Sequence, residues 1–493
     1  MNHKSETYSF KFSVITAVYN VASYLSEAIE SILCQDIGFK DSVELILVDD
    51  GSTDSSGKIC DHYQALYPDN IKVLHKPNGG AASARNAGIA LASGRYLNFL
   101  DGDDKLSPGT LSAVYHFFST VDDQISLVSV PIQFFEKKET AHRLNYKYKD
   151  GKNQIINLNA QYSYVQMSIA SSFIKREVLN EHSFDTSLRY AEDAKVIMQL
   201  LLEHPYYGIV PSGCYYYRFR NTQNSALNGT KLHKEWYLDC LKDYLLWALQ
   251  AARQKYGSIP LFVQYNVMYD LQSRFGVPEI PTSILSPDEH EEFRALLKEL
   301  LRSIDDKIIL QQRNLSREQK DYIISLKRGD GVLKHSSNDI FFQYNRLKLY
   351  PASSYLLKLF HAEISEDDLK LTGAVKFNRR FPYPSALYVQ LHGLLKIHTF
   401  PCDWSADTSS DFVFDGTLLS QFLNFEVRVP LRLLHRQTHL QFCMTCDKHS
   451  VIFRNLRGEP GFPDVLSSSQ NSYRLCVNSD SLFLKKHPTL LSS

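Results

Sequence analysis

Short apolar runs and amphipathic segments alternate over the first hundred residues. Between the first two runs, Leu25, Ala28, Ile29 and Ile32 recur at helical spacing. Continuously apolar strands that alternate with helices are typical of a parallel sheet covered on both faces. The pattern therefore predicts an α/β domain. The expected strands lie at residues 12–19, 43–50, 71–75 and 95–100.

The hydrophobic periodicity changes twice further along the chain. From about residue 230 the spacing is helical, and Ser286, Pro287 and Glu289 form a capping-box signature at the start of one expected helix. Beyond about residue 331, apolar and polar positions alternate, which predicts short antiparallel strands in a sandwich or barrel. We predict an α/β domain at 1–229, a helical connector region at 230–330 and a β-rich accessory domain at 331–493.

Composition narrows the classes of function. Lys plus Arg and Asp plus Glu each number 54, so no basic field directs this chain of 493 residues toward nucleic acid. The 8 cysteines are widely spread, which favours reduced thiols and a cytoplasmic location. We expect no signal peptide and no spanning helix, because no apolar stretch reaches the roughly 18 residues required. Peripheral contact with the inner face of a membrane stays open.

Three carboxylates follow the fourth expected strand directly, in the stretch "LNFLDGDD". Asp101, Asp103 and Asp104 raise one another's pKa values unless a positive group compensates. Mg²⁺ and Mn²⁺ prefer carboxylate oxygen, so a divalent cation is one explanation, and a polar turn in water is the other. Asp49 and Asp50 end the second strand in the same way. Since ligands bind at the carboxyl ends of parallel strands, we expect the site at this edge of the sheet.

Several motifs occur in a fixed order along the chain. They are "SVITAVYN", "LILVDDGSTDSS", "KPNGGAASARNAGIALASGRY", "LNFLDGDD", "RYAEDAKV" and "YYYRFRNTQNS". Together they resemble the inverting bacterial glycosyltransferases of family two, which have a Rossmann-like GT-A fold and a DxD motif. The later regions resemble the accessory regions of Gram-positive polysaccharide and teichoic-acid transferases. The resemblance implies a metal-dependent transfer of a sugar from a nucleotide-sugar, with a UDP-sugar as the expected donor.

The resemblance also implies roles for the residues of these motifs. Asp103 is expected to ligate Mn²⁺ or Mg²⁺, which bridges the two phosphates, and Asp101 faces the ribose and metal. Gly102 lets the backbone come close, while Asp104 supports this loop. Asp50 is expected to accept a hydrogen bond from N3–H of uracil, a donor that cytosine lacks. Thr16, Tyr19, Asn78 and Arg85 occupy positions around the base and ribose; the alternatives are strand packing for Thr16 and Tyr19 and a surface helix position for Arg85.

Two later motifs complete the expected site. Asp193 in "RYAEDAKV" matches the catalytic base of the family, with Glu192 beside it; the alternative is a pair of carboxylates that favour a helix N-terminus. Arg218, Arg220 and Ser225 are expected to close over the pyrophosphate. Related sequences often carry a histidine in this loop, and its absence here favours phosphate pairing over metal ligation.

A cluster of histidines and cysteines near the C-terminus invites a zinc interpretation. His435, His439, Cys443, Cys446 and His449 have suitable spacing. Against this, the segment has the alternation of a strand, which points Cys443 and Cys446 to opposite faces. We expect a strand rather than a zinc site.

The sequence thus predicts an enzyme that extends a cell-surface polysaccharide, a wall polymer or a lipid-linked precursor. The rival from another class is a non-catalytic carbohydrate-binding or assembly protein on a transferase scaffold. A third interpretation keeps the enzyme and changes the nucleotide-activated donor. The sugar, the linkage and the state of oligomerisation, including a homo-oligomer, stay open.

Overall fold

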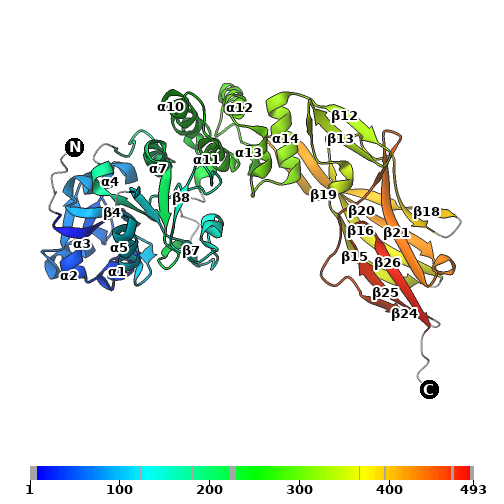
Figure 1. The fold of residues 1–493 in the computed structure, drawn as a ribbon, viewed down its shortest axis with the longest axis horizontal. Helices are drawn as coiled ribbons and strands as arrows, with labels where there is room; N and C mark the ends of the chain where they lie inside the picture. The colour runs from blue at the N-terminus through cyan, green and yellow to red at the C-terminus, as the bar shows by residue number, and fades with distance from the viewer. Residues whose placement is uncertain are drawn as a thin grey trace, which may run out of the picture. The chain divides into compact units, whose positions relative to one another are not determined.

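The chain forms two compact units in a computed structural model that describes residues 8–121, 124–179, 182–220, 229–365, 367–392, 396–467 and 471–488 (Figure 1). The N-terminal unit comprises residues 1–271 and 282–308, and the C-terminal unit comprises residues 272–281 and 309–493. The three-part division at residues 230 and 331 stays a prediction.

The N-terminal unit is built on a mostly parallel sheet with the strand order β3-β2-β1-β4-β9-β6-β10-β8. Strand β1 pairs in parallel with both β2 and β4, and β2 pairs in parallel with β3. The α/β fold expected from the sequence is confirmed. The strands are β1 (Phe10–Val18), β2 (Val43–Asp49), β3 (Ile71–His75), β4 (Gly94–Asp101), β6 (Leu127–Ser129), β8 (Gln154–Asn157), β9 (Ser172–Lys175) and β10 (Tyr206–Ile209).

Helices cover both faces of this sheet. Phe12 and Val14 of β1 share one buried apolar cluster with Leu25 of α1 and Phe118 of α5. On the opposite face, α4 packs so closely that a Cβ atom at Gly88 would lie 2.3 Å from Cγ2 of Ile15. The alternation of side chains along β1 therefore assigns each helix to its face. These helices are α1 (Ala22–Leu33), α2 (Phe39–Ser42), α3 (Ser56–Leu66), α4 (Gly80–Leu91) and α5 (Thr110–Val121).

The strand order contains a topological switch point. The chain runs from β1 outward through β2 to β3 and then returns to place β4 on the other side of β1. Connections on the two sides of β1 diverge, and in open α/β sheets ligands bind at the carboxyl ends of the strands at such a point, here β1 and β4. A separate small sheet consists of β5 (Lys105–Leu106), β11 (Tyr215–Phe219) and β7 (Ile132–Glu136).

Within the helical segment, Cys240–Leu246 forms a π-helix and not an α-helix. The expected capping box is confirmed: Oγ of Ser286 accepts from the Glu289 amide at 3.3 Å, and the Glu289 carboxylate accepts from the Ser286 amide at 2.8 Å. The α-helices are α6 (Arg176–Leu179), α7 (Glu192–Glu203), α9 (Lys234–Tyr237), α10 (Trp247–Tyr256), α11 (Leu261–Leu271), α12 (Pro287–Arg302), α13 (Asp306–Gln311) and α14 (Arg317–Arg328).

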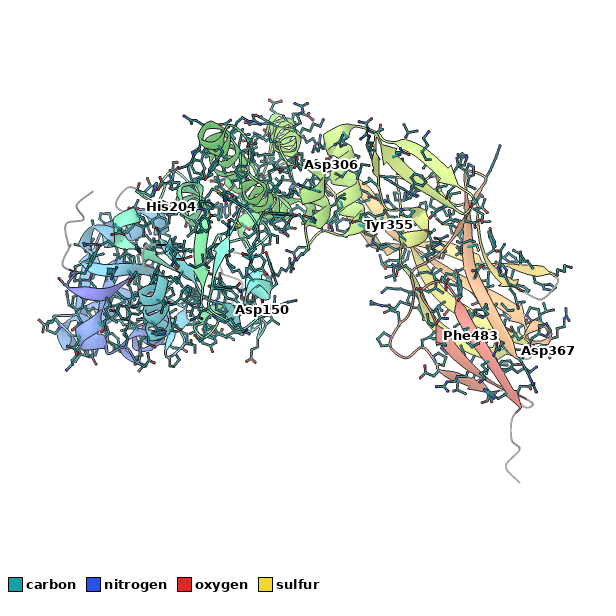
Figure 2. All side chains as sticks on the ribbon, viewed as in Figure 1. Asp150, His204, Asp306, Tyr355, Asp367 and Phe483 are labelled. Atoms are coloured by element: carbon teal, nitrogen blue, oxygen red, sulfur yellow. The ribbon has the colours of Figure 1, made fainter. Side chains whose placement is uncertain are left out.

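The C-terminal unit consists mainly of antiparallel sheets, which confirms a β-rich domain. Its two larger sheets meet through Phe425 and Phe442, whose ring centroids are 5.7 Å apart. Tyr355, labelled in Figure 2, is buried, and its hydroxyl donates to Asp321 of α14. The larger sheets have the strand orders β19-β20-β16-β15-β23 and β18-β17-β21-β26-β25-β24, with β22 beside β21, and a third sheet has the order β12-β13-β14.

The bounds of these strands follow the alternating pattern of the sequence. They are β12 (Val332–Ser336), β13 (Asp339–Tyr344), β14 (Leu347–Lys348), β15 (Leu357–Ser365), β16 (Asp368–Asn378), β17 (Ala386–His392), β18 (Ile397–Pro401), β19 (Asp403–Phe414), β20 (Thr417–Pro430), β21 (Gln437–Cys446), β22 (His449–Ile452), β23 (Leu456–Gly458), β24 (Val465–Ser467), β25 (Asn471–Val477) and β26 (Leu482–Pro488).

All cysteines are free thiols. Among the described residues, none of the helices combines the length and the apolar character that crossing a membrane requires.

Candidate active site

The carboxyl ends of β1, β2 and β4 bring the N-terminal motifs together. Asn20 follows β1 with a positive φ of 53°, and its side-chain oxygen accepts from the Thr53 amide at 2.8 Å. Gly51 follows β2 with a φ of 76°, and a Cβ there would lie 2.9 Å from the backbone nitrogen of Asn78. The glycine therefore permits both the turn and the close approach of the loop that carries Asn78.

Asp50 is buried and already holds four hydrogen-bonding contacts. Its carboxylate accepts from Nζ of Lys76 at 2.5 Å, from the Gly80 amide at 2.7 Å, and from the Gly79 amide at 3.0 Å and 3.1 Å. Asp50 thus anchors the loop before α4 to the end of β2. Its predicted contact with uracil stays a prediction.

The other residues assigned to the base and ribose differ in exposure. Thr16 is buried in β1, and its hydroxyl has no hydrogen-bond partner among the described residues. Tyr19 is 50% exposed and Asn78 is exposed, so both side chains are accessible. The predicted contacts of these residues with the base and the ribose stay predictions, as does the alternative of strand packing for Thr16 and Tyr19.

Arg85 links the start of the DGDD loop to the segment that carries the expected catalytic base, Asp193. Its Nη2 donates to Asp101 at 3.0 Å, and its Nη1 donates to Glu192 at 2.8 Å. The guanidinium is buried and also lies over the ring of Phe184. Arg85 is therefore an interior residue of the site and not a surface helix residue.

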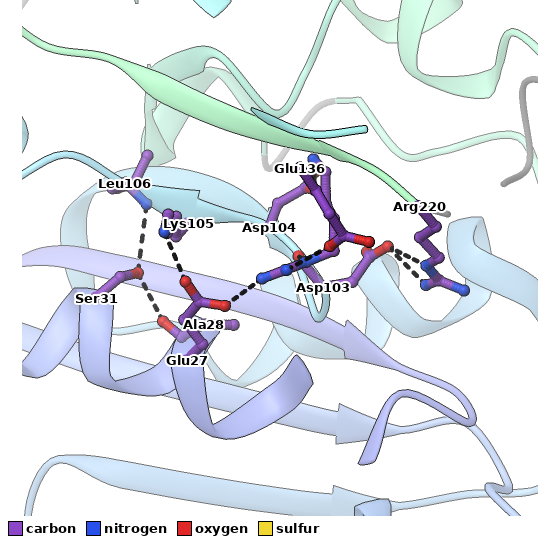
Figure 3. Close-up of polar contacts among 10 residues, drawn as sticks. Glu27, Ala28, Ser31, Asp103, Asp104, Lys105, Leu106, Glu136 and Arg220 are labelled. Carbon is purple, nitrogen blue, oxygen red and sulfur yellow. Dashed lines mark hydrogen bonds and ion pairs between the residues drawn. The ribbon is translucent and has the colours of Figure 1, made fainter. Parts of the chain in front are cut away.

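Asp103 is paired with Arg220, whose Nε and Nη2 lie 2.7 Å and 2.6 Å from the same carboxylate oxygen (Figure 3). Asp104 points inward, where its carboxylate accepts from the Tyr215 hydroxyl at 2.6 Å and from the Arg218 amide at 2.7 Å. Gly102 leaves room for Val21, because a Cβ there would lie 2.9 Å from Cγ2 of that residue.

Arg218 is held by two carboxylates that the sequence interpretation did not include. Its Nη1 donates to Glu136 at 2.8 Å, its Nη2 pairs with Glu27, and its Nε donates to the Asp103 carbonyl at 2.7 Å. The side chain of Arg218 therefore fixes the DGDD loop against α1 and β7. Its predicted phosphate contact stays a prediction, and Ser225 lies outside the described residues.

The acidic loop is electrostatically unfavourable for charged carboxyls. Burial and the neighbouring Asp101 raise the pKa of Asp103, although Arg220 acts in the opposite direction. Burial and the charges of Asp103 and Asp101 raise the pKa of Asp104 well above its ordinary value. A divalent cation fits this donor set, because carboxylate oxygens suit Mg²⁺ and Mn²⁺ and a dication favours their ionised form. No group of three or more His, Cys, Asp or Glu side chains in the described ranges is arranged to hold a metal, so a bound ion would need further ligands.

Asp193 lies in the first turn of α7, two residues after a strained residue. Ala191 has a φ of 67°, a left-handed conformation that is costly for a residue with a Cβ. Burial and the charge of Glu192 raise the pKa of Asp193 to about 7, although the charge of Arg85 acts in the opposite direction. A carboxyl with a pKa near neutrality suits proton abstraction at neutral pH.

The His/Cys cluster lies in the C-terminal unit. Cys443 and Cys446 are both buried in β21, and the expected strand is confirmed. His449 stacks on His335, with ring centroids 3.9 Å apart.

Comparison with known proteins agrees with this geometry. The family described as "Glycosyl transferase family 2" matches residues 13–183. Minor teichoic acid biosynthesis protein GgaA of Bacillus subtilis is 35% identical over 307 residues, which cover 61% of this chain and 68% of GgaA. GgaB of the same organism is 31% identical over 459 residues, which cover 91% of this chain and 49% of GgaB. The chain thus spans about half the length of GgaB and about two thirds of GgaA.

Solved structures show the same fold. The crystal structure of S. aureus TarS matches with a TM-score of 0.59 and 14% identity, over 98% of this chain and 86% of that chain. TarS 1–349 in complex with UDP-GlcNAc matches with a TM-score of 0.53 and 17% identity, over 69% of this chain and 99% of that chain.

The N-terminal unit has the fold of a GT-A glycosyltransferase. The chain belongs to glycosyl transferase family 2 and is related to two Bacillus subtilis proteins that are named for minor teichoic acid biosynthesis.

Proposed function

We propose that the protein transfers a sugar from a UDP-sugar, with inversion and with the help of a divalent cation, to a hydroxyl of a wall polymer. Two relatives are named for minor teichoic acid biosynthesis, which supports a teichoic-acid-type acceptor. Solved structures of TarS hold UDP and UDP-GlcNAc, which supports a uridine nucleotide donor. The reaction then occurs on the cytoplasmic side, as expected from the cysteine content.

The proposed reaction is one displacement. The acceptor oxygen attacks the anomeric carbon from the face opposite UDP, a new C–O bond forms, and the bond to the diphosphate oxygen breaks with its electron pair. Asp193 takes the acceptor proton as the bond forms. Arg85 orients Glu192 beside the base and Asp101 beside the donor, so one side chain joins the two halves of the site.

Asp103 and Asp101 would hold Mn²⁺ or Mg²⁺. The ion would supply positive charge to the diphosphate as negative charge develops on the leaving group. Arg220 occupies the carboxylate of Asp103 and carries the charge that phosphate recognition requires. When the donor binds, Arg220 then leaves Asp103 and pairs with the diphosphate.

The link from Asp101 through Arg85 to Glu192 is the observation that carries this proposal, because it joins donor and base motifs at one strand edge. A thermal-shift screen of nucleotide-sugars, with and without Mn²⁺, tests it. A bound donor raises the melting temperature by mass action, so a UDP-sugar with Mn²⁺ should give the largest shift. A larger shift with a CDP-, GDP- or TDP-linked sugar would overturn the uridine assignment.

A further inference from the structure

The C-terminal unit contains a polar cavity of about 410 Å³ that takes no part in the proposed transfer chemistry. Its lining comes from parts of the chain that are far apart in sequence. The start of α14 supplies Arg317, β14 supplies Lys348, and the stretch before β23 supplies Arg454 and Asn455. The fold of the unit, and not one exposed loop, therefore builds the cavity.

The cavity is strongly cationic. Within the described residues, Arg317, Lys348 and Arg454 form no ion pair with a carboxylate. The carboxyl group in the lining belongs to Asp339, which is 8% exposed. Its oxygens accept from the Ile340 amide at 2.9 Å, the Ser353 amide at 3.0 Å and the Ser353 hydroxyl. Asp339 is thus directed into the protein and does not pair with any of the three cationic side chains.

Other contacts hold two of these cations in place. The guanidinium of Arg317 lies 5.1 Å from the ring centroid of Tyr350, and its Nη1 donates to the Ser354 carbonyl. Nζ of Lys348 lies 3.7 Å from the ring centroid of Phe341. Rings and a carbonyl position the cationic groups while most of their N–H donors stay unused. A site that is ordered before binding loses less entropy when it binds.

A phosphate group complements this set of donors. Guanidinium groups bind phosphate oxygens through paired N–H donors, and an ammonium adds a compact charge. Asn455, Ser336 and Ser354 also line the cavity. Nδ2 of Asn455 donates to the Ser354 carbonyl at 3.1 Å and Oγ of Ser354 donates to the Pro351 carbonyl at 2.7 Å, so their side-chain oxygens suit neutral hydroxyls as acceptors. The volume exceeds that of a single phosphate and lies within the range of small-molecule sites. A phosphate joined to a hydroxyl-bearing unit fits both the charge and the volume.

We propose that this cavity binds a phosphodiester unit of the wall-polymer acceptor and so holds the polymer on the C-terminal unit. The anion chemistry stands on the cavity itself, whereas the identity of the polymer rests on the proposed function, since teichoic acids are phosphodiester-linked polymers. Binding here keeps successive acceptor hydroxyls at a raised effective concentration near the enzyme.

The test compares two doubly substituted full-length proteins. Lys348→Gln with Arg454→Gln removes two cations from the cavity, and Arg317 stays in place because it packs at the start of α14. The matched control is Arg474→Gln with Lys485→Gln, which removes an exposed cross-strand pair from β25 and β26. The probe is a fluorescent oligomer of glycerol phosphate, with binding followed by polarisation at low and at physiological salt.

We expect the cavity variant to raise Kd for the oligomer about tenfold or more, and the control variant to change it less than about twofold. Equal Kd values for the cavity variant and the native protein would overturn the proposal. Inorganic phosphate that competes as well as the oligomer would assign the cavity to free phosphate. A single-stranded DNA of equal charge that binds as tightly would also overturn the polymer assignment.

Two activity measurements separate this proposal from the proposed function. With a short monomeric acceptor, both doubly substituted proteins should keep native turnover, and with the polymer only the cavity variant should show a raised KM. If the native protein transferred no sugar but the cavity variant still lost binding of the oligomer, the proposed function would be refuted and the anion site in the cavity would be supported. Normal polymer KM in the cavity variant would refute the cavity and leave the transfer reaction standing.

Discussion

Arg220 donates from both Nε and Nη2 to one carboxylate oxygen of Asp103, at 2.7 Å and 2.6 Å. The guanidinium therefore pairs with the carboxylate to which the sequence assigns the metal ion. The charge of Arg220 lowers the pKa of Asp103, but burial and Asp101 still leave that pKa raised, so Arg220 compensates the acidic loop only in part. A metal ion and Arg220 compete for this carboxylate, so metal binding should be tight only when the diphosphate provides Arg220 with another partner.

The metal assignment predicts that Asp103→Asn abolishes the gain in donor affinity that Mn²⁺ provides. An amide oxygen carries no net charge and is a poorer ligand for a hard cation. Calorimetric titration of UDP-sugar with Mn²⁺ and with EDTA measures the gain. Asp69→Asn, at an exposed position between α3 and β3, is the control and should behave as the native protein. If the native protein bound the donor as tightly in EDTA as in Mn²⁺, the metal assignment would be contradicted.

The next prediction concerns Asp50 and its expected hydrogen bond to the uracil of the donor. We expect Asp50→Ala to weaken UDP as strongly as UDP-sugar, because the substitution removes the acceptor for uracil and frees the loop that Lys76 and Gly80 anchor. The native protein should bind UDP at least about tenfold more tightly than CDP, the value of one good hydrogen bond to a charged group. Tighter binding of CDP in the same calorimetric titration would refute the uridine interpretation.

The raised pKa of Asp193 predicts the pH dependence of turnover. The carboxylate is the active form, so kcat should fall as the pH drops below about 7. Well below that pH, kcat should fall by about tenfold per pH unit. Stability should change in the opposite sense, because a carboxyl whose folded-state pKa exceeds its ordinary 3.8 destabilises the fold increasingly between pH 4 and 7. Asp193→Asn should therefore melt at or above the native temperature at pH 8. A kcat profile that is flat from pH 5 to 8 would contradict this account.

Arg85 should tune that pH dependence. The guanidinium lowers the pKa of Asp193, so Arg85→Gln should move the acidic limb of kcat to higher pH. Arg85→Lys keeps the charge but cannot bridge Asp101 and Glu192 in the same way, so the limb should stay in place while kcat falls. An identical limb in the native and Arg85→Gln proteins would show that Arg85 acts only through packing.

Local patterns predicted the parts of the fold that local physics determines. The buried strands around Thr16 and Asp50 show as continuous apolar runs, and the capping box at Ser286 needs only residues within one helical turn. The partners of Arg218 could not be predicted in this way. Glu27 and Glu136 lie on α1 and β7, and only the folded topology brings them to β11.

In the candidate site, too, local motifs predicted the residues but not their tertiary partners. The motifs identified Asp103 and Arg220, but nothing in the spacing indicated that the two side chains pair with each other. The π-helix at residues 240–246 was also unpredictable, because its leucines keep a spacing that an ordinary α-helix shares. Tertiary packing decides such features, and periodicity reports only which face is apolar.

The central claim is that Asp193 removes the acceptor proton. The most direct measurement compares kcat, KM and donor affinity of Asp193→Asn with those of Glu203→Gln, a carboxyl-to-amide change at the other end of α7. The account predicts that Asp193→Asn lowers kcat by about 10²–10⁴ while donor affinity and KM change only a few fold, and that Glu203→Gln is native in all three. Native turnover per folded molecule in Asp193→Asn would contradict the account and leave Asp193 as a carboxylate at a helix start.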